Sequence, residues 1–133
     1  MTAIARMNPQ SLPDAAQAGY SQISIAEPGR LAFVSGQVAW RRDGGAAPDA
    51  LAEQAEIVTG NLSSALGELK ATTDDIVQMR IYMVDLNNDS MATAMGAIGR
   101  FLNGARPSLT GVGVSALAAP GLLIEVDMVV RVA

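Results

Sequence analysis

The stretch LLIEVDMVVRV, residues 122–132, decides the fold because its side chains alternate in character along its whole length. One set of alternate positions is entirely apolar and consists of Leu122, Ile124, Val126, Met128, Val130 and Val132. The other set consists of Leu123, Glu125, Asp127, Val129 and Arg131. A helix keeps neither set together on one face, so the pattern predicts a strand that buries one face and presents Glu125 on the other.

Further strands are predicted upstream of this segment. Residues 21–25 and 31–35 flank the turn signal Glu27-Pro28-Gly29-Arg30 and are expected to pair as a hairpin. Residues 76–85 alternate in the same way as the last strand, and residues 108–117 are expected to form a third core strand.

Two helices are predicted between these strands. The first opens at Pro48-Asp49, with Asp49 as its cap, and ends near Lys70. The second begins at residues 87–90 and is ended by Asn103-Gly104. Its apolar stripe is formed by Met91, Met95, Ile98 and Leu102.

This order of elements predicts an α+β fold, with a mixed sheet that carries both helices on one face. The whole chain, residues 1–133, is expected to form one domain, with residues 1–18 as an irregular lead-in. The opposite sheet face mixes charged and apolar residues, which favours burial against a second copy of the chain. Its polar members are Gln78, Arg80, Tyr82, Glu125, Asp127 and Arg131.

The composition narrows the chemistry. The chain has no cysteine and no histidine, which excludes thiolate and imidazole catalysis and Cys/His zinc sites. Carboxylates, Lys70, the tyrosines and water remain as acids and bases. Asp74-Asp75 has no further ligands at metal-binding spacing, so no metal site is expected.

Location and partners follow from charge and hydropathy. The net charge is −4 and the longest basic run is Arg41-Arg42, so no nucleic-acid partner is expected. The first residues lack the apolar region of a signal peptide, and no apolar run approaches the ~20 residues of a membrane span. We therefore expect a cytoplasmic protein that does not insert into membranes.

Six short segments, taken in order, form a recognisable set. They are Tyr20-Ser21-Gln22, Phe33-Val34-Ser35-Gly36-Gln37, Gln54…Asn61, Tyr82-Met83-Val84-Asp85-Leu86-Asn87, Val112-Gly113-Val114-Ser115-Ala116-Leu117 and Leu123-Ile124-Glu125-Val126. In this order and spacing they resemble the Rid family (reactive intermediate deaminase, also called YjgF or L-PSP). The resemblance covers residues 20–132, which is nearly the whole chain.

The resemblance implies a chorismate-mutase-like fold and a homotrimer with a barrel-like core and a small-molecule cleft at each subunit junction. Deaminating members of the family hydrolyse reactive imines and enamines, such as 2-aminoacrylate, without a metal or other cofactor. Such chemistry suits a chain that lacks histidine and cysteine, because the imine is already electrophilic and water is the nucleophile.

The resemblance also assigns roles to individual residues. Glu125 would position the water or the substrate nitrogen, and its alternative role is an interface ion pair with Arg80 or Arg131. Tyr20 would line the cleft or simply plug the subunit junction. Ser35 and Gly36 would lie near the ligand, although a bulge glycine is an equally good reading.

In this family an arginine binds the substrate carboxylate. This chain has no arginine at the matching position. Counting three residues back from Val112 reaches Leu109, and Arg106 lies three residues too early to take that place. Thr110 fits the family pattern and would donate to a ligand or simply suit a strand. Arg80 or Arg106 reaching into the cleft would replace the missing cation.

Two functions compete on this reading. The first is a Rid-type deaminase whose 2-imino-acid activity is altered or lost because Leu109 replaces the arginine. The second is a non-enzymatic trimer that binds a neutral or apolar small molecule. Ribonuclease activity, which some relatives are said to have, is disfavoured because the chain offers neither histidine nor a basic stripe for RNA.

Overall fold

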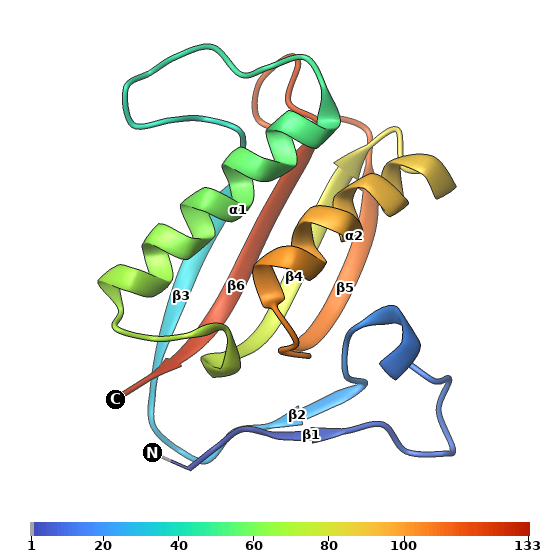
Figure 1. The fold of residues 1–133 in the computed structure, drawn as a ribbon, viewed down its shortest axis with the longest axis vertical. Helices are drawn as coiled ribbons and strands as arrows, with labels where there is room; N and C mark the ends of the chain where they lie inside the picture. The colour runs from blue at the N-terminus through green and yellow to red at the C-terminus, as the bar shows by residue number, and fades with distance from the viewer. Residues whose placement is uncertain (1) are drawn as a thin grey trace.

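Four strands form the main sheet, in the spatial order β3-β6-β4-β5 (Figure 1). They are β3 (Arg30–Gln37), β4 (Ile76–Val84), β5 (Ser108–Val114) and β6 (Ile124–Val132). In this computed structural model, which describes residues 2–133, β6 pairs antiparallel with both β3 and β4. β5 runs parallel to β4 at one edge of the sheet. The mixed α+β architecture predicted from the sequence is therefore confirmed.

The central position of β6 explains its strict alternation. Ile124, Val126, Met128 and Val130 are at most 1% exposed and form the floor of the core. Glu125 and Asp127, on the other face, are half-buried. A strand with partners on both sides has all its backbone groups paired, so its side-chain pattern alone decides which face is dry.

Two helices cover the same face of this sheet, as predicted (Figure 1). They are α1 (Leu51–Glu68) and α2 (Asn88–Leu102). α2 begins at the cap Asn87, whose side chain accepts a hydrogen bond from the Ser90 amide. It ends at Asn103, which has a left-handed backbone conformation with φ of 47°.

The start of α1 differs from the prediction. Its cap is Ala50, which makes no side-chain hydrogen bond, so Asp49 does not cap the helix. The wholly buried Gln54 organises this end instead: its amide nitrogen donates to the Pro48 and Gly121 carbonyls, each at 2.8 Å, and its oxygen accepts from the Leu123 amide at 2.9 Å. One side chain thus joins the helix start to the loop that leads into β6.

The expected hairpin between residues 21–25 and 31–35 is wrong. β2 (Ile23–Ile25) pairs antiparallel with β1 (Ala5–Met7), whereas β3 pairs with β6. β3 is long enough to bury Ala32 and Val34 against the core, but three-residue β2 is not. Arg6 fixes the β1–β2 ribbon to the sheet by donating to the Ile76 carbonyl at 2.6 Å.

Residues 2–18 are more regular than the lead-in expected from the sequence. Besides β1 they contain a single 3₁₀ turn, Ala16–Ala18, which ends at Gly19 with φ of 84°. β5 also differs from expectation, because it is an edge strand rather than a core strand. Its residues 110–113 are exposed, and only β4 pairs with it within the sheet.

Candidate functional site

Glu125 lies in a shallow hollow of about 290 Å³ on the open face of the sheet, which we call the Glu125 hollow. The hollow is lined by Gly36, Gln37, Val38, Trp40, Asn61, Ala118 and Glu125. The chain therefore places one carboxylate among mostly uncharged groups. A carboxylate in such a place can accept a proton or a hydrogen bond from a water or a ligand nitrogen.

A bulge in β3 makes room for this carboxylate. The register of β3 against β6 shifts between Val34 and Gln37, so Ser35 and Gly36 form the bulge. A Cβ atom on Gly36 would lie 2.4 Å from Oε2 and 2.9 Å from Cγ of Glu125. Glycine at position 36 is therefore a requirement of the Glu125 side chain as the structure places it.

Glu125 makes no ion pair with any residue of the described chain, so neither Arg80 nor Arg131 neutralises it within one copy. Arg80 instead donates two hydrogen bonds of 2.9 Å to Asp127, and these bonds raise the pKa of Arg80. Arg131 is 3% exposed and donates to the Thr2 carbonyl. The alternative of an interface ion pair with Arg80 or Arg131 concerns a contact between two copies and stays a prediction.

Ser35 and Thr110 lie on the same open face, but neither lines the Glu125 hollow. Ser35 lines a separate hollow of about 190 Å³ with Phe33 and the Arg80–Asp127 pair. Thr110 is exposed on β5 and is level with Arg80. The residue of β5 that shares a level with Glu125 is Val112, through Tyr82 of β4.

Tyr20 and Leu109 line a different hollow, of about 250 Å³, which we call the Leu109 hollow. It is formed by Ala18, Tyr20, Ile81, Met91, Met95, Leu109 and Gly111, none of which is charged. A Cβ on Gly111 would approach Cε of Met91 to 3.2 Å, so the absent side chain keeps the methionine close to the sheet. Neither Arg80 nor Arg106 is among the lining residues.

The side chains of Leu109 and Glu125 point to opposite faces of the sheet. Leu109 is level with the buried Met79 in the parallel register and packs against the core on the helix side. Glu125 alternates with the buried Ile124 and Val126 and so faces away from the helices. Within one chain, Glu125 and Leu109 cannot contact the same small ligand.

Several residues of these hollows were not assigned a site role from the sequence. Asn61 of α1 reaches the Glu125 hollow and donates to the Trp40 carbonyl at 2.9 Å. Met91 and Met95, expected as part of the core stripe, are only half-buried and line the Leu109 hollow. Their helical spacing indicated a buried face, but it contained no sign that the face is only partly covered.

No three acidic residues within residues 2–133 are grouped closely enough to hold a metal ion. In the same part of the chain, neither helix combines the length and hydropathy needed to cross a bilayer.

Comparison with known proteins gives consistent matches over this fold. Residues 10–132 match the family model described as Endoribonuclease L-PSP. The RutC family protein YjgH of Escherichia coli (strain K12) is 34% identical over 106 residues, which are 78% of this chain and 77% of that protein. The mitochondrial protein MMF1 of Saccharomyces cerevisiae is 27% identical over 88% of this chain and 77% of its own length.

A solved structure agrees over almost the full length. YyfB from Yersinia pestis, described as a protein of unknown function of the conserved Rid protein family, superposes with a TM-score of 0.91. It is 32% identical and covers 98% of this chain and 100% of its own. The matched family model and this relative together show that the chain belongs to the Endoribonuclease L-PSP family, also called YjgF or Rid.

Proposed function

We propose that this protein is a cofactor-free hydrolase of reactive imines or enamines, and that it works as a homotrimer. The observation that carries the proposal is Glu125, whose carboxylate lies over Gly36 without a cationic partner among residues 2–133. The other acid on this strand, Asp127, is already engaged by Arg80. Glu125 is therefore the acid that is available to a ligand.

The reaction follows from this one carboxylate. Water adds to the electrophilic imine carbon while Glu125 accepts a proton from the water. Glu125 returns this proton to the nitrogen, which gives a carbinolamine. Glu125 then transfers the hydroxyl proton to the same nitrogen as the carbon–nitrogen bond breaks, and a carbonyl compound and ammonia are released. Atoms and charges balance without a metal or a redox partner, and a positioned general base of this kind contributes about 10²- to 10⁴-fold in rate.

The homotrimer supplies what one chain lacks. The side chains of Glu125 and Leu109 point to opposite faces of the sheet, so a complete cleft needs the Glu125 face of one copy against the Leu109 edge of the next. Phe33 is 76% exposed on the open face and Val112 is 40% exposed on the edge strand. Apolar surface of this kind is typical of a face that another subunit covers.

Leu109 sets the substrate class. It stands where the family resemblance expects the arginine that binds a carboxylate, and the hollow around it is apolar. A charge-assisted hydrogen bond contributes about 1.5–3 kcal/mol, so its loss weakens binding of a 2-imino acid by about ten- to a hundred-fold. We therefore propose that the substrates are imines without a carboxylate on the reacting carbon.

The test is hydrolysis of imines generated in solution, with and without a carboxylate beside the imine carbon. We expect Glu125→Gln to slow hydrolysis of the neutral imine by about a hundred-fold or more, whereas Glu53→Gln, an exposed acid on α1, leaves it unchanged. Equal rates for wild type and Glu125→Gln, or for wild type and buffer, would refute the hydrolase.

A second variant tests the substrate class. Leu109→Arg is expected to raise the rate on 2-iminopropionate by about ten- to a hundred-fold, since it restores a cation at the carboxylate position. The neutral imine should gain nothing from the same substitution. A gain for both substrates, or for neither, would contradict the role given to Leu109.

The apolar Leu109 hollow also favours a second candidate, a non-enzymatic trimer that binds a neutral small molecule. Thermal shift with a panel of neutral and apolar compounds separates the two. If the protein only binds a small molecule, such a compound should stabilise it while no imine is hydrolysed. A panel without any stabilising compound would count against it.

A further inference from the structure

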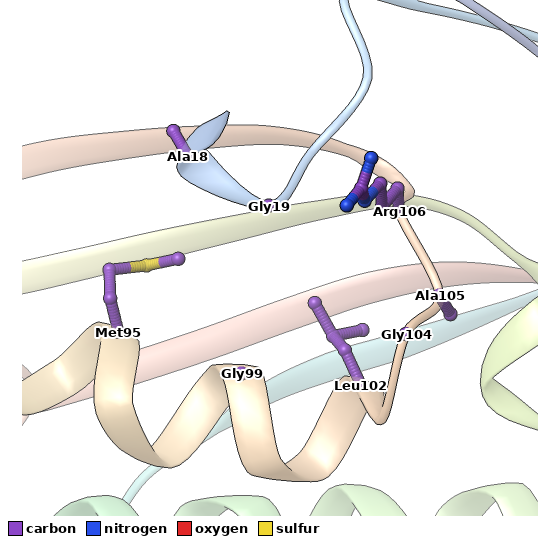
Figure 2. A pocket seen from close by; sticks show the side chains of 8 residues that line it. All are labelled: Ala18, Gly19, Met95, Gly99, Leu102, Gly104, Ala105 and Arg106. Atoms are coloured by element: carbon purple, nitrogen blue, oxygen red, sulfur yellow. The ribbon is translucent and has the colours of Figure 1, made fainter. Parts of the chain in front are cut away.

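A third hollow, of about 220 Å³, continues from the Leu109 hollow along α2, and we call it the Arg106 hollow. It is lined by Ala18, Gly19, Met95, Gly99, Leu102, Gly104, Ala105 and Arg106. Ala18 and Met95 also line the Leu109 hollow, so the two are neighbours in one groove. Figure 2 shows α2 with Met95 and Leu102 on one side, the Ala18–Gly19 segment opposite, and Arg106 near Gly104 at one end.

Among the described residues, Arg106 alone is charged and lines this groove. Its backbone is held in place by Ser21, which is 2% exposed and whose hydroxyl donates to the Arg106 carbonyl at 2.6 Å. The Ser21 amide donates to the Pro107 carbonyl at 3.1 Å in addition. These two hydrogen bonds therefore fix the backbone that carries the Arg106 guanidinium at the end of an apolar groove.

From this arrangement we propose that the groove binds an amphipathic monocarboxylate, with its carboxylate on Arg106 and its apolar chain over Met95 and Leu109. Leu109 lies three positions after Arg106, which corresponds to roughly 10 Å of extended chain. The preferred acid therefore carries its carboxylate several carbons away from the end that reaches Leu109. The inference rests on the proposed function only in treating the Leu109 hollow as part of the cleft.

A second hollow beside Arg106 is a poorer place for the carboxylate. It is larger, about 450 Å³, and contains Arg6 and Asp74 besides Arg106. The Arg6 guanidinium already donates to the Ile76 carbonyl at 2.6 Å and to the Ser24 hydroxyl at 2.8 Å. Asp74 repels an anion there, whereas no acidic residue lines the groove along α2.

The C-terminal end of α2 opposes an anion in the groove, but its field is the weaker one. A helix end carries about half an elementary charge, whereas the guanidinium carries a full one. Two carbonyls near this end are also occupied: that of Gly99 accepts from the Asn103 amide, and that of Leu102 accepts from the Ala105 amide. The sum of the two electrostatic effects at the end of the groove therefore favours a carboxylate.

Gly99 provides a way to close the groove. It shares a helix face with Met95 and Leu102, and a Cβ placed on it meets no atom within 4 Å. A leucine at this position therefore extends into the open space of the groove without displacing the core. Gly67 on α1 offers the matched control, since its Cβ also meets nothing within 4 Å and it lines neither part of the groove.

The experiment is calorimetric titration of the whole protein with octanoate and with 1-octanol, which has the same chain without the charge. We expect octanoate to bind about tenfold or more tightly than 1-octanol, because a charge-assisted hydrogen bond is added. Arg106→Gln should reduce the affinity for octanoate to the affinity for 1-octanol. Arg42→Gln makes the same change of charge in an exposed loop and should not reduce the affinity for octanoate. Gly99→Leu should abolish binding of both probes, and Gly67→Leu should not.

The proposal is overturned if octanoate binds no better than 1-octanol, or if Arg106→Gln or Gly99→Leu binds octanoate like the wild type. Thermal unfolding of each variant shows whether it is folded before it is titrated. The readout is binding and not turnover, and Glu125→Gln is expected to keep it. Failure of the imine hydrolysis test with intact octanoate binding therefore argues against the proposed reaction alone.

Discussion

The two faces of the central sheet are made from the same strands, yet they are built differently. On the helix-covered face, Met79, Ile81, Ile124 and Val126 are all wholly buried. On the open face, the Arg80–Asp127 pair lies near Phe33, which is 76% exposed. The covered face is complete in one chain, whereas the open face combines charges and apolar groups in a way that a second copy would complete.

This difference separates the face that stabilises the single chain from the face that presents Glu125. The covered face holds only apolar groups, whose burial is non-directional and whose close packing makes loss of volume costly. The open face holds Glu125 over a bulge glycine, where the shape of a single residue decides the position of the carboxylate. Substitutions on the two faces should therefore differ in size and in kind.

The largest expected effect is on the covered face. Ile124→Ala should lower the free energy of unfolding by about 2–5 kcal/mol, because it removes a wholly buried side chain and leaves a cavity. Urea denaturation measures the loss. Gln78→Ala, exposed on the open face of neighbouring β4, is the control and should change stability by no more than about 0.5 kcal/mol. Equal losses for both would remove the distinction between the faces.

A smaller effect is expected at the bulge. Gly36→Ala brings a Cβ to within 2.4 Å of the Glu125 carboxylate, which ends a flexible, half-buried side chain and turns aside at a cost of about 0.5–1.5 kcal/mol. In a Glu125→Ala background the same substitution should cost less than about 0.5 kcal/mol, since the clashing atoms are gone. A double-mutant cycle from urea denaturation gives the coupling, and additive values would show that the two residues do not touch.

The smallest effect is expected for the ion pair of the open face. Arg80 and Asp127 are 52% and 20% exposed, so a cycle of their alanine variants should give a coupling in the low range of solvent-exposed ion pairs, and this coupling should fall with added salt. The measurement is made at low protein concentration, where single copies are favoured. A coupling far above this range that resists salt would mean that another copy shields the pair from water.

Much of the fold could be predicted because it depends on short-range patterns. The alternation in residues 122–132 indicated a two-faced strand, and the structure confirms it as β6. The Asn87 cap and the Asn103-Gly104 ending of α2 were likewise visible locally. The resemblance to the Rid family, carried by short segments in order, is confirmed by the matched family model.

Other features depended on contacts between distant parts of the chain. Residues 23–25 pair with residues 5–7 and not with β3, because a three-residue strand has too few side chains to determine its own partner. Gln54 replaced Asp49 at the start of α1 by reaching Gly121 and Leu123, 67 and 69 residues away. Neither pairing leaves a periodic signal in the sequence.

The sequence by itself determined the alternation that buries one face of β6, the absence of histidine and cysteine chemistry, and the family. These depend on residue types and on neighbours along the chain. Only the tertiary structure decided that Glu125 and Leu109 lie on opposite faces and that Arg106 stands at the end of a groove along α2. The physical reason is that a hollow is formed by residues far apart in sequence, whose packing no local pattern records.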